Sequence, residues 1–230
     1  MLTDLQGSFL DLLLSSGALR FGQFKTKSGR MSPFFLNSGA FDHGEILRSV
    51  ARCYAKRLVH FSKTNPISTW HLYGPAYKGI TLAAATAMEL ALETGKEVAF
   101  TFNRKEVKDH GEGGFLIGRE IRANSEIVIV EDVLTGGTSV RQTLDLLRPI
   151  NPRVGAVIVG VDRMERGVGQ YTAAAEIRDA FKIPVVSILS IQEIIDALWQ
   201  DGRPLPRMGK AWLDSSLKAS IDEYRSQWGG

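Results

Sequence analysis

The stretch that most constrains this chain is an aliphatic run followed directly by two acids and a glycine-rich turn. The run is Ile-Val-Ile-Val at 127–130, the acids are Glu131 and Asp132, and the turn at 135–139 reads Thr-Gly-Gly-Thr-Ser. Four consecutive β-branched residues are typical of a short strand buried on both faces, as in a parallel sheet. A helical pattern follows at 139–147, so the stretch predicts a strand, a tight turn and a helix.

The order of these residues also predicts a binding site. Glycines allow a tight turn, and the amides at a helix amino terminus point toward any anion bound there. Ligands bind where parallel strands end, and two carboxylates at that place suit the hydroxyls of a sugar. A glycine-rich turn alone would be an ordinary connection, but the full combination favours a site for a phosphorylated sugar.

Hydrophobic periodicity predicts strands that alternate with helices. Helices are expected at 5–14, 45–61, 80–92, 139–147, 170–181, 191–199 and 212–228, and strands at 70–74, 98–102, 127–130, 154–161 and 185–189. This alternation implies an α/β fold with a central, mostly parallel sheet and right-handed crossovers. Residues 21–37 predict an antiparallel hairpin over that sheet, whereas residues 103–114 have no periodicity and are expected to form a loop.

Length and composition bound the remaining choices. A chain of 230 residues, 44% apolar and 23% charged, suits a single α/β domain spanning 1–230. The net charge of +3, without a dense run of Lys and Arg, argues against a nucleic-acid partner. No apolar run has the length of a membrane span, and the amino-terminal residues do not resemble a secretory signal. The single cysteine, Cys53, fits a reduced, cytoplasmic setting.

Several familiar catalytic motifs are absent from the sequence. There is no P-loop, no complete Gly-x-Gly-x-x-Gly pattern and no Gly-x-Ser-x-Gly elbow. One cysteine and scattered histidines do not supply the spacing of a zinc site. These absences disfavour P-loop nucleotide chemistry and zinc chemistry.

Two other groups of basic residues are candidates for ligand binding. Arg104, Lys105, Lys108 and His110 lie just before three glycines, which predicts a loop that opens and closes over a polyanion such as pyrophosphate. A solvated charged loop is the alternative. Lys78 and Arg163 each follow a predicted strand and face the same crevice as the acids. The planar fork of arginine suits a carboxylate.

These motifs resemble those of the type I phosphoribosyltransferases, whose signature for phosphoribosyl pyrophosphate (PRPP) matches residues 127–139. Three further segments narrow the resemblance to the orotate phosphoribosyltransferases. They are Lys-Ser-Gly-Arg-Met-Ser-Pro at 27–33, Gly-Pro-Ala-Tyr-Lys-Gly-Ile at 74–80 and the charged segment at 103–114. The resemblance covers nearly the whole chain. It implies the type I phosphoribosyltransferase fold, with a small hood formed by residues 1–40, approximately, and a mobile catalytic lid at 103–114.

The resemblance also implies a reaction and its site. PRPP and orotate would give orotidine 5′-monophosphate and pyrophosphate in pyrimidine biosynthesis, with Mg²⁺ held mainly by PRPP and water and no direct protein ligand. The implied catalytic residues are Arg104, Lys105, Lys108, His110 and Asp132, with Lys108 stabilising the departing charge. The implied PRPP-binding residues are Lys27, Tyr77, Lys78, Arg104, Lys105, Lys108, His110, Glu131, Asp132, Val133, Leu134, Thr135, Gly136, Gly137, Thr138 and Ser139. The implied orotate-binding residues are Phe35, Leu36, Thr135 and Arg163, with Lys27 near them.

The resemblance further implies a homodimer in which the lid reaches the neighbouring subunit's site, with no nucleic-acid or membrane partner. Three positions depart from the family pattern. Leu36 replaces a second aromatic residue, Glu131 opens an acid pair that is more often Asp-Asp, and Gly136 stands where alanine is frequent. Two alternatives stay open: a phosphoribosyltransferase for another base, such as a purine, and a PRPP-binding regulator that binds nucleic acid. Segment 27–33 and the lid sequence disfavour the first. The second would need a basic face outside the PRPP site and could dispense with the lid residues, and the sequence meets neither condition.

Overall fold

A six-stranded sheet forms the middle layer of the computed structural model, which describes residues 2–26, 29–108, 114–200 and 213–230; for 106–108 and 200 it describes the backbone only. The strands, in the spatial order β5-β4-β3-β6-β7-β8, are β5 (Gly114–Gly118), β4 (Val98–Lys108), β3 (Trp70–Gly74), β6 (Glu126–Leu134), β7 (Arg153–Asp162) and β8 (Val185–Ser190). Each strand is parallel to its neighbours except β5, which pairs antiparallel with β4 at one edge. The predicted α/β class is confirmed.

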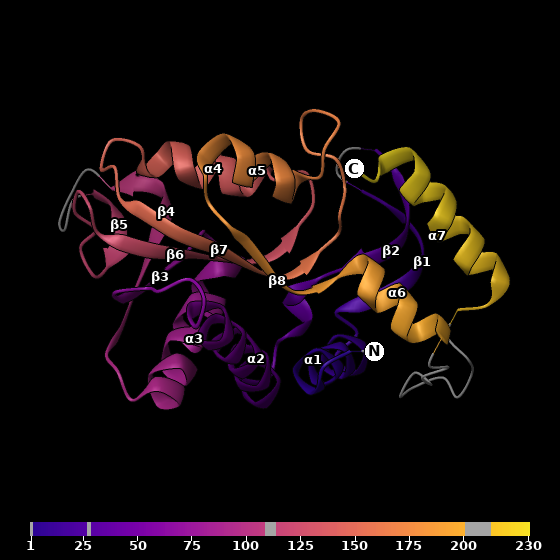
Figure 1. Cartoon of the computed structure of the whole chain (residues 1–230), viewed down its shortest axis with the longest axis horizontal. Coiled ribbons are helices and arrows are strands. Elements are labelled where there is room, and N and C mark those ends of the chain that lie inside the picture. Colours follow the sequence, from indigo (N-terminus) through magenta and orange to yellow (C-terminus); the bar gives the residue numbers. More distant parts are fainter. Residues whose placement is uncertain (1, 27–28, 109–113, 201–212) are drawn as a thin grey trace.

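Helices cover both faces of this sheet (Figure 1). The helices α1 (Asp4–Ser15), α2 (Gly44–Ser62) and α3 (Lys78–Thr94) lie on one face, and α4 (Thr138–Leu147) and α5 (Ala173–Phe181) lie on the other. The strands β1 (Leu19–Lys25) and β2 (Met31–Leu36) form a separate antiparallel hairpin, as predicted, beside α6 (Ile191–Gln200) and α7 (Ser215–Trp228). A short 3₁₀ turn, Ser38–Ala40, joins β2 to α2. None of the helices in the described ranges is long and apolar enough to cross a bilayer.

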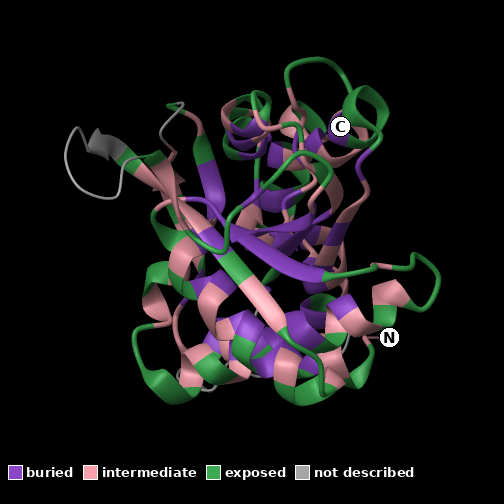
Figure 2. Ribbon diagram, turned by 90° about the vertical axis from the view of Figure 1, so that its left-hand side faces the viewer, coloured by how far each residue is buried: buried purple, intermediate pink, exposed green. Residues whose placement is uncertain are grey.

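The central strand β6 is buried on both faces, as its aliphatic run predicts. Ile127 and Ile129 pack in the cluster beneath α4 and α5, whereas Val128 and Val130 pack in the cluster beneath α1, α2 and α3. All four residues are fully buried. Figure 2 shows the buried strands enclosed between more exposed helices. Packing on both faces therefore fixes the position of β6 up to its carboxyl end, where Glu131 and Asp132 lie.

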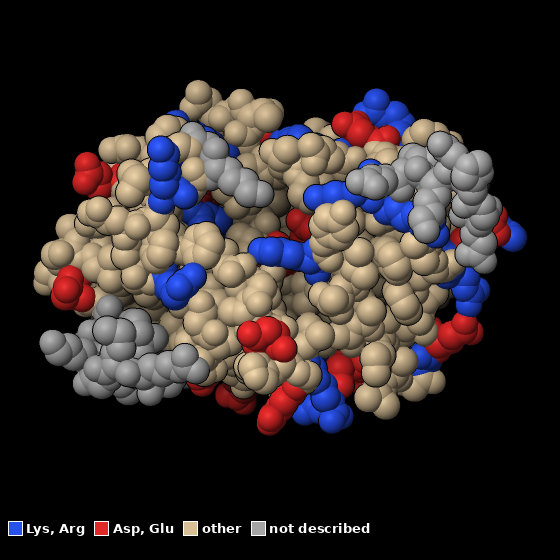
Figure 3. All heavy atoms as spheres, turned by 180° about the vertical axis from the view of Figure 1, so that it is seen from behind, with Lys and Arg blue, Asp and Glu red and all other residues tan. Residues whose placement is uncertain are grey.

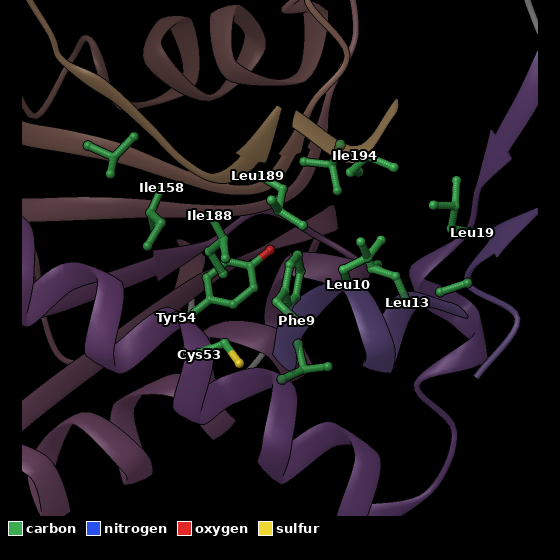
Figure 4. Packing of buried hydrophobic residues seen from close by; sticks show 14 of the residues in the cluster. Phe9, Leu10, Leu13, Leu19, Cys53, Tyr54, Ile158, Ile188, Leu189 and Ile194 are labelled. Atoms are coloured by element: carbon green, nitrogen blue, oxygen red, sulfur yellow. The ribbon is translucent and has the colours of Figure 1, made fainter. Parts of the chain in front are cut away.

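The larger cluster also supports the backbone of that pair directly. Phe9 of α1 meets Tyr54 of α2 edge to face, with ring centroids 6.2 Å apart, and both rings lie against β8 (Figure 4). The Tyr54 hydroxyl donates a hydrogen bond of 2.9 Å to the backbone oxygen of Glu131. Cys53 is buried in the same cluster, and burial raises the pKa of its thiol to about 11. This cysteine therefore acts as a core residue.

Two predicted boundaries are wrong. Segment 103–114 is not a loop throughout, because β4 continues to Lys108 and β5 begins at Gly114, and these two residues pair across the hairpin. Four of the last six residues of β4 are charged, so apolar alternation does not reveal that arm, and the five-residue strand β5, which begins and ends with glycine, was not predicted. The strand predicted at 127–130 continues to Leu134, since Glu131 and Val133 pair with β7. Residue 212, the predicted start of the last helix, lies outside the described residues.

Candidate active site

The loops after β3, β6 and β7 bring most of the predicted site residues to one edge of the sheet. The strand β3 ends just before the turn to Lys78, β6 ends with the acid pair and Leu134, and β7 ends at Asp162. In open α/β sheets, ligands bind at this carboxyl edge. The sequence-predicted residues at these strand ends therefore lie together at the edge where such folds bind ligands.

Asp132 links the main sheet to the segment that follows the hairpin. Its Oδ2 accepts a hydrogen bond of 2.5 Å from Ser38 Oγ and lies 3.4 Å from Lys78 Nζ, while its Oδ1 accepts from the Val133 amide at 2.8 Å. Lys78 Nζ also donates to Asn37 Oδ1 at 3.3 Å. These contacts hold a carboxylate and an ammonium group side by side at the mouth of the crevice.

Glu131 lies in a different environment from its neighbour. It is 8% exposed, and burial raises the pKa of its carboxyl to about 7, with the charge of Asp132 acting in the same direction. A hydrogen bond from Ser139 and the charge of Lys78 lower this pKa without offsetting the rise. Near neutral pH a large fraction of Glu131 is protonated, so this group both donates and accepts hydrogen bonds.

The glycine-rich turn presents the amino end of α4. Gly137 is the N-cap residue with φ of +78°, a backbone conformation that favours glycine, and a Cβ there would come 3.2 Å from Ile177. No side chain among the described residues caps this end of α4, so its first amides are available to an anion. At Gly136, a Cβ would meet only the backbone oxygen of Arg166, at 3.9 Å. The position accepts glycine or alanine equally well.

A close crossing of two backbones sets the position of Lys78. A Cβ on Gly74 would lie 2.1 Å from the carbonyl oxygen of Gly79, so that no other residue fits at 74 without moving α3. Asn103 holds the intervening turn from the other side, since its Oδ1 accepts from the Ala76 amide at 3.0 Å. The helix therefore begins directly behind β3, with Lys78 facing the acid pair.

The end of β4 contacts the same turn. Lys105 Nζ lies 4.5 Å from the centre of the Tyr77 ring, a cation–π contact. Arg104 Nε is buried and has no hydrogen-bond partner among the described residues. The side chain of Lys108, like His110 and Lys27 as a whole, lies outside the described residues. The structure thus places Lys105 beside the turn that precedes Lys78. The predicted roles of Arg104, Lys108, His110 and Lys27 remain predictions.

The residues predicted to bind orotate lie on the hairpin and behind it. The Phe35 ring stacks on Phe24, with centroids 5.3 Å apart, whereas Leu36 packs against the core, where an aliphatic residue fits. Arg163 is only 7% exposed, and its Nη2 lies 2.6 Å from Glu165 Oε1. Its guanidinium is therefore buried behind the crevice, already paired with a carboxylate.

Three contributors to this site were missed from the sequence. Ser38 and Asn37 contact the acid and the lysine, and Asn103 orders the turn between β3 and α3. A turn at Asn37 is readable from Asn-Ser-Gly, because the asparagine side chain accepts from the Gly39 amide at 3.1 Å. The contacts of Ser38 with Asp132 and of Asn37 with Lys78 could not be predicted from a local sequence pattern, because the partners are far apart in the sequence.

Comparison with known proteins agrees with this geometry. Residues 40–187 match the family model described as a phosphoribosyl transferase domain. The orotate phosphoribosyltransferase of Laribacter hongkongensis is 41% identical over 228 residues, which cover 99% of each chain. That of Lachnoclostridium phytofermentans is 41% identical over 222 residues, 96% of each chain.

Comparison with solved structures supports the same family fold. The orotate phosphoribosyltransferase of Francisella tularensis matches with a TM-score of 0.77 and 30% identity, covering 96% of this chain and 99% of that one. UMP synthase of Leishmania donovani shares the fold at 22% identity, with a TM-score of 0.73 over 43% of its length. The type I phosphoribosyltransferase fold is confirmed. From these near full-length matches, we conclude that this chain belongs to the orotate phosphoribosyltransferase family.

Proposed function

We propose that this protein transfers the phosphoribosyl group of PRPP to orotate, giving orotidine 5′-monophosphate and pyrophosphate in pyrimidine biosynthesis. The observation that carries the proposal is the meeting of Asp132, Lys78 and the uncapped amino end of α4 at one edge of the sheet. A sugar bearing a phosphate and a diphosphate offers hydroxyls to the acid and anions to the other two. The choice of orotate as the acceptor base rests on relatives that are 41% identical to this chain and are named orotate phosphoribosyltransferases.

Each part of PRPP has a suitable partner. The 5′-phosphate suits the turn at 135–139, where backbone amides and the hydroxyls of Thr135, Thr138 and Ser139 are donors. The ribose hydroxyls suit Glu131 and Asp132, with the backbone of Val133 and Leu134 behind them. The pyrophosphate suits the basic residues Lys27, Lys78, Arg104, Lys105, Lys108 and His110 and the neighbouring Tyr77.

The change of charge during the reaction explains why acids and cations are both needed. When the bond from the anomeric carbon to pyrophosphate breaks, positive charge develops on the ribosyl ring and negative charge on the leaving group. Asp132, fixed by Ser38 and the Val133 amide, presents a negative charge that needs no rearrangement. Lys108 and the other lid cations would stabilise the diphosphate. One preorganised group of this kind is worth roughly 3 kcal/mol.

We propose that orotate lies between the hairpin and Arg163, contacting Phe35, Leu36 and Thr135. A guanidinium recognises the carboxylate that distinguishes orotate from uracil. Mg²⁺ would be held mainly by PRPP oxygens and water, because Ser38 and Lys78 already engage Asp132 and much of Glu131 is protonated near neutral pH. When bound, the ion neutralises diphosphate charge.

We further propose one domain with a hood at its amino end and a lid at 103–114, a homodimer whose lid reaches the partner's site, and a cytoplasmic location. These proposals rest on the family resemblance. A regulator that binds nucleic acid is the competing function, and it needs a broad basic surface. Figure 3 shows one face on which acidic and basic side chains are interspersed, also around its central hollow, which favours the enzyme.

A base-selectivity assay tests the proposed function. PRPP-dependent turnover is measured with Mg²⁺ and orotate, uracil, adenine or hypoxanthine, and orotate alone is expected to react. Use of a purine without use of orotate would overturn the assignment, as would salt-sensitive nucleic-acid binding without turnover.

The lid assignment has its own test. Lys108→Ala should lower kcat about 100-fold and PRPP affinity much less, because the lost charge acts on the departing group. Lys96→Ala, which removes an exposed lysine elsewhere, is the matched control. An unchanged kcat in a folded Lys108→Ala protein would contradict the role.

A further inference from the structure

A buried polar cluster lies between the hairpin, the loop after β7 and helix α7. Glu165 is 3% exposed, and its Oε1 accepts a hydrogen bond of 2.9 Å from the Tyr224 hydroxyl. Ser32 Oγ accepts from Arg163 Nη2 at 3.1 Å. Figure 1 shows how the three segments converge, with α7 alongside β1 and β2. Arg163, which we expect to bind the carboxylate of orotate, is thus surrounded by residues from three distant parts of the chain.

These contacts fix the plane and the rotation of the Arg163 guanidinium. Its Nε and Nη2 lie 2.7 and 2.6 Å from the same oxygen of Glu165, and its centre lies 4.4 Å from the centre of the Phe34 ring. Its hydrogen bonds to described residues use Nε and Nη2, which leaves Nη1 for a ligand. Because the guanidinium is planar, a partner on one edge determines the direction of the other.

The charges of the cluster favour an anionic ligand. Arg30 Nη1 lies 3.5 Å from Glu165 Oε2, and its guanidinium lies 4.0 Å from the centre of the Trp228 ring. Two guanidinium groups therefore share one carboxylate, and the cluster has a net positive charge. A second carboxylate, supplied by the ligand, would neutralise it. Without Glu165, two like charges would face each other and Arg163 would lose its fixed orientation.

We propose that Glu165 and Tyr224 are positioning residues that aim Arg163 at the carboxylate of the base, so that helix α7 takes part in base selection. This inference rests on the proposed function. It differs from a merely structural role because it predicts an effect on the base and none on PRPP. Among the described residues, the side chains of Glu165 and Tyr224 contact each other, Arg163, Arg30 and Phe34, and not Asp132 or the side chains of the glycine-rich turn.

The test compares Glu165→Gln, Tyr224→Phe and the control Glu223→Gln, which changes an exposed acid next to Tyr224 on α7. The KM for orotate should rise about 10-fold in Glu165→Gln and about 3-fold in Tyr224→Phe, as expected for losing a hydrogen bond to a charged group. The KM for PRPP and its calorimetric Kd should stay within about 2-fold. Glu223→Gln should resemble the wild type.

The outcomes separate the inference from the proposed function. If the wild-type protein does not use orotate, the proposed function fails. If it does, and both variants raise the two KM values equally or change neither, the positioning role is overturned. Should Glu165→Gln not fold, Tyr224→Phe decides alone, because it removes a single hydroxyl. A selective rise in the KM for orotate supports the role.

Discussion

Glu126 and Glu131 lie on the same strand, β6, and are almost equally buried, at 6% and 8% exposed, yet their environments are opposite. At Glu126, burial acts to raise the pKa, but hydrogen bonds from the Ser68 side chain and amide and the charge of Arg153 outweigh it, so the pKa is lowered. At Glu131, burial prevails and raises the pKa to about 7.

The difference shows how one strand serves two purposes. At the amino end of β6, the protein supplies the acid with donors, including the Ser68 amide at 2.8 Å and Arg153 at 3.5 Å. At the carboxyl end, the acid has too few donors to offset its burial. Perturbed groups of this kind gather at functional sites, where a ligand completes their hydrogen bonds. The same residue type is therefore stabilised as a carboxylate at one end of the strand and kept partly protonated at the other.

The largest effect is expected at Asp132, the second acid at the carboxyl end. Asp132→Asn removes the charge that we propose faces the ribosyl ring, and it disturbs the contacts of Ser38 and Lys78. It should lower kcat/KM for PRPP about 100-fold, which corresponds to roughly 3 kcal/mol. Steady-state kinetics measures this, with Glu126→Gln as the control at the other end of the strand. Wild-type kinetics in Asp132→Asn would remove the assigned role.

Next in size is a gain in stability from Glu131→Gln. A carboxyl whose pKa is raised by folding from 4.5 to about 7 destabilises the folded state progressively as pH rises through that window. The variant should therefore exceed the wild type in free energy of unfolding by up to about 3 kcal/mol at pH 8, and by far less at pH 5. Urea denaturation at both pH values measures it. Parallel pH profiles for the two proteins would contradict the raised pKa.

Glu126→Gln should have the opposite sign. A carboxyl with a lowered pKa contributes stability that is present above its unfolded value of 4.5 and is lost as the pH falls through its folded value. The variant should be less stable by about 2 kcal/mol at pH 7, with a smaller difference in acid. The same denaturation series checks this. A variant as stable as the wild type at pH 7 would show that Ser68 and Arg153 do not stabilise the carboxylate.

The smallest effect is expected for Ser68→Ala. Loss of the hydroxyl donor should cost about 1 kcal/mol and move the pKa of Glu126 upward, toward the behaviour of Glu131. A double-mutant cycle with Glu126→Gln measures the coupling, because the effect of Ser68→Ala should shrink when the carboxylate is gone. Equal effects in both backgrounds would place the hydroxyl outside this interaction.

The layers of the fold were predictable because they follow from repeating patterns. Uninterrupted aliphatic runs marked the inner strands such as β6, and the 3.6-residue period marked helices such as α2. The hairpin arms beyond Phe102 were not predictable in this way, because four of the six residues that end β4 are charged and β5 is a short segment between two glycines. Pairing between the two strands, as between Lys108 and Gly114, forms them instead.

Candidate site residues were predictable where they follow one another in the sequence, and much less so where they meet through folding. The acid pair and the glycine-rich turn form one continuous motif. The contact of Ser38 with Asp132 joins residues 94 positions apart, and no local pattern announces it. The pairing of Arg163 with Glu165 spans two positions, yet only burial by the hairpin and α7 decides that this acid turns inward.

The crossing of Gly74 and Gly79 has a consequence for how this chain can change over time. Since a single methyl group at 74 would collide with the backbone of α3, a library randomised at that position should return glycine almost alone among active clones. Neighbouring surface positions remain open to substitution. The backbone crossing that holds Lys78 beside Asp132 therefore cannot change by single substitutions at Gly74, and any adaptation of this site would have to arise at other positions.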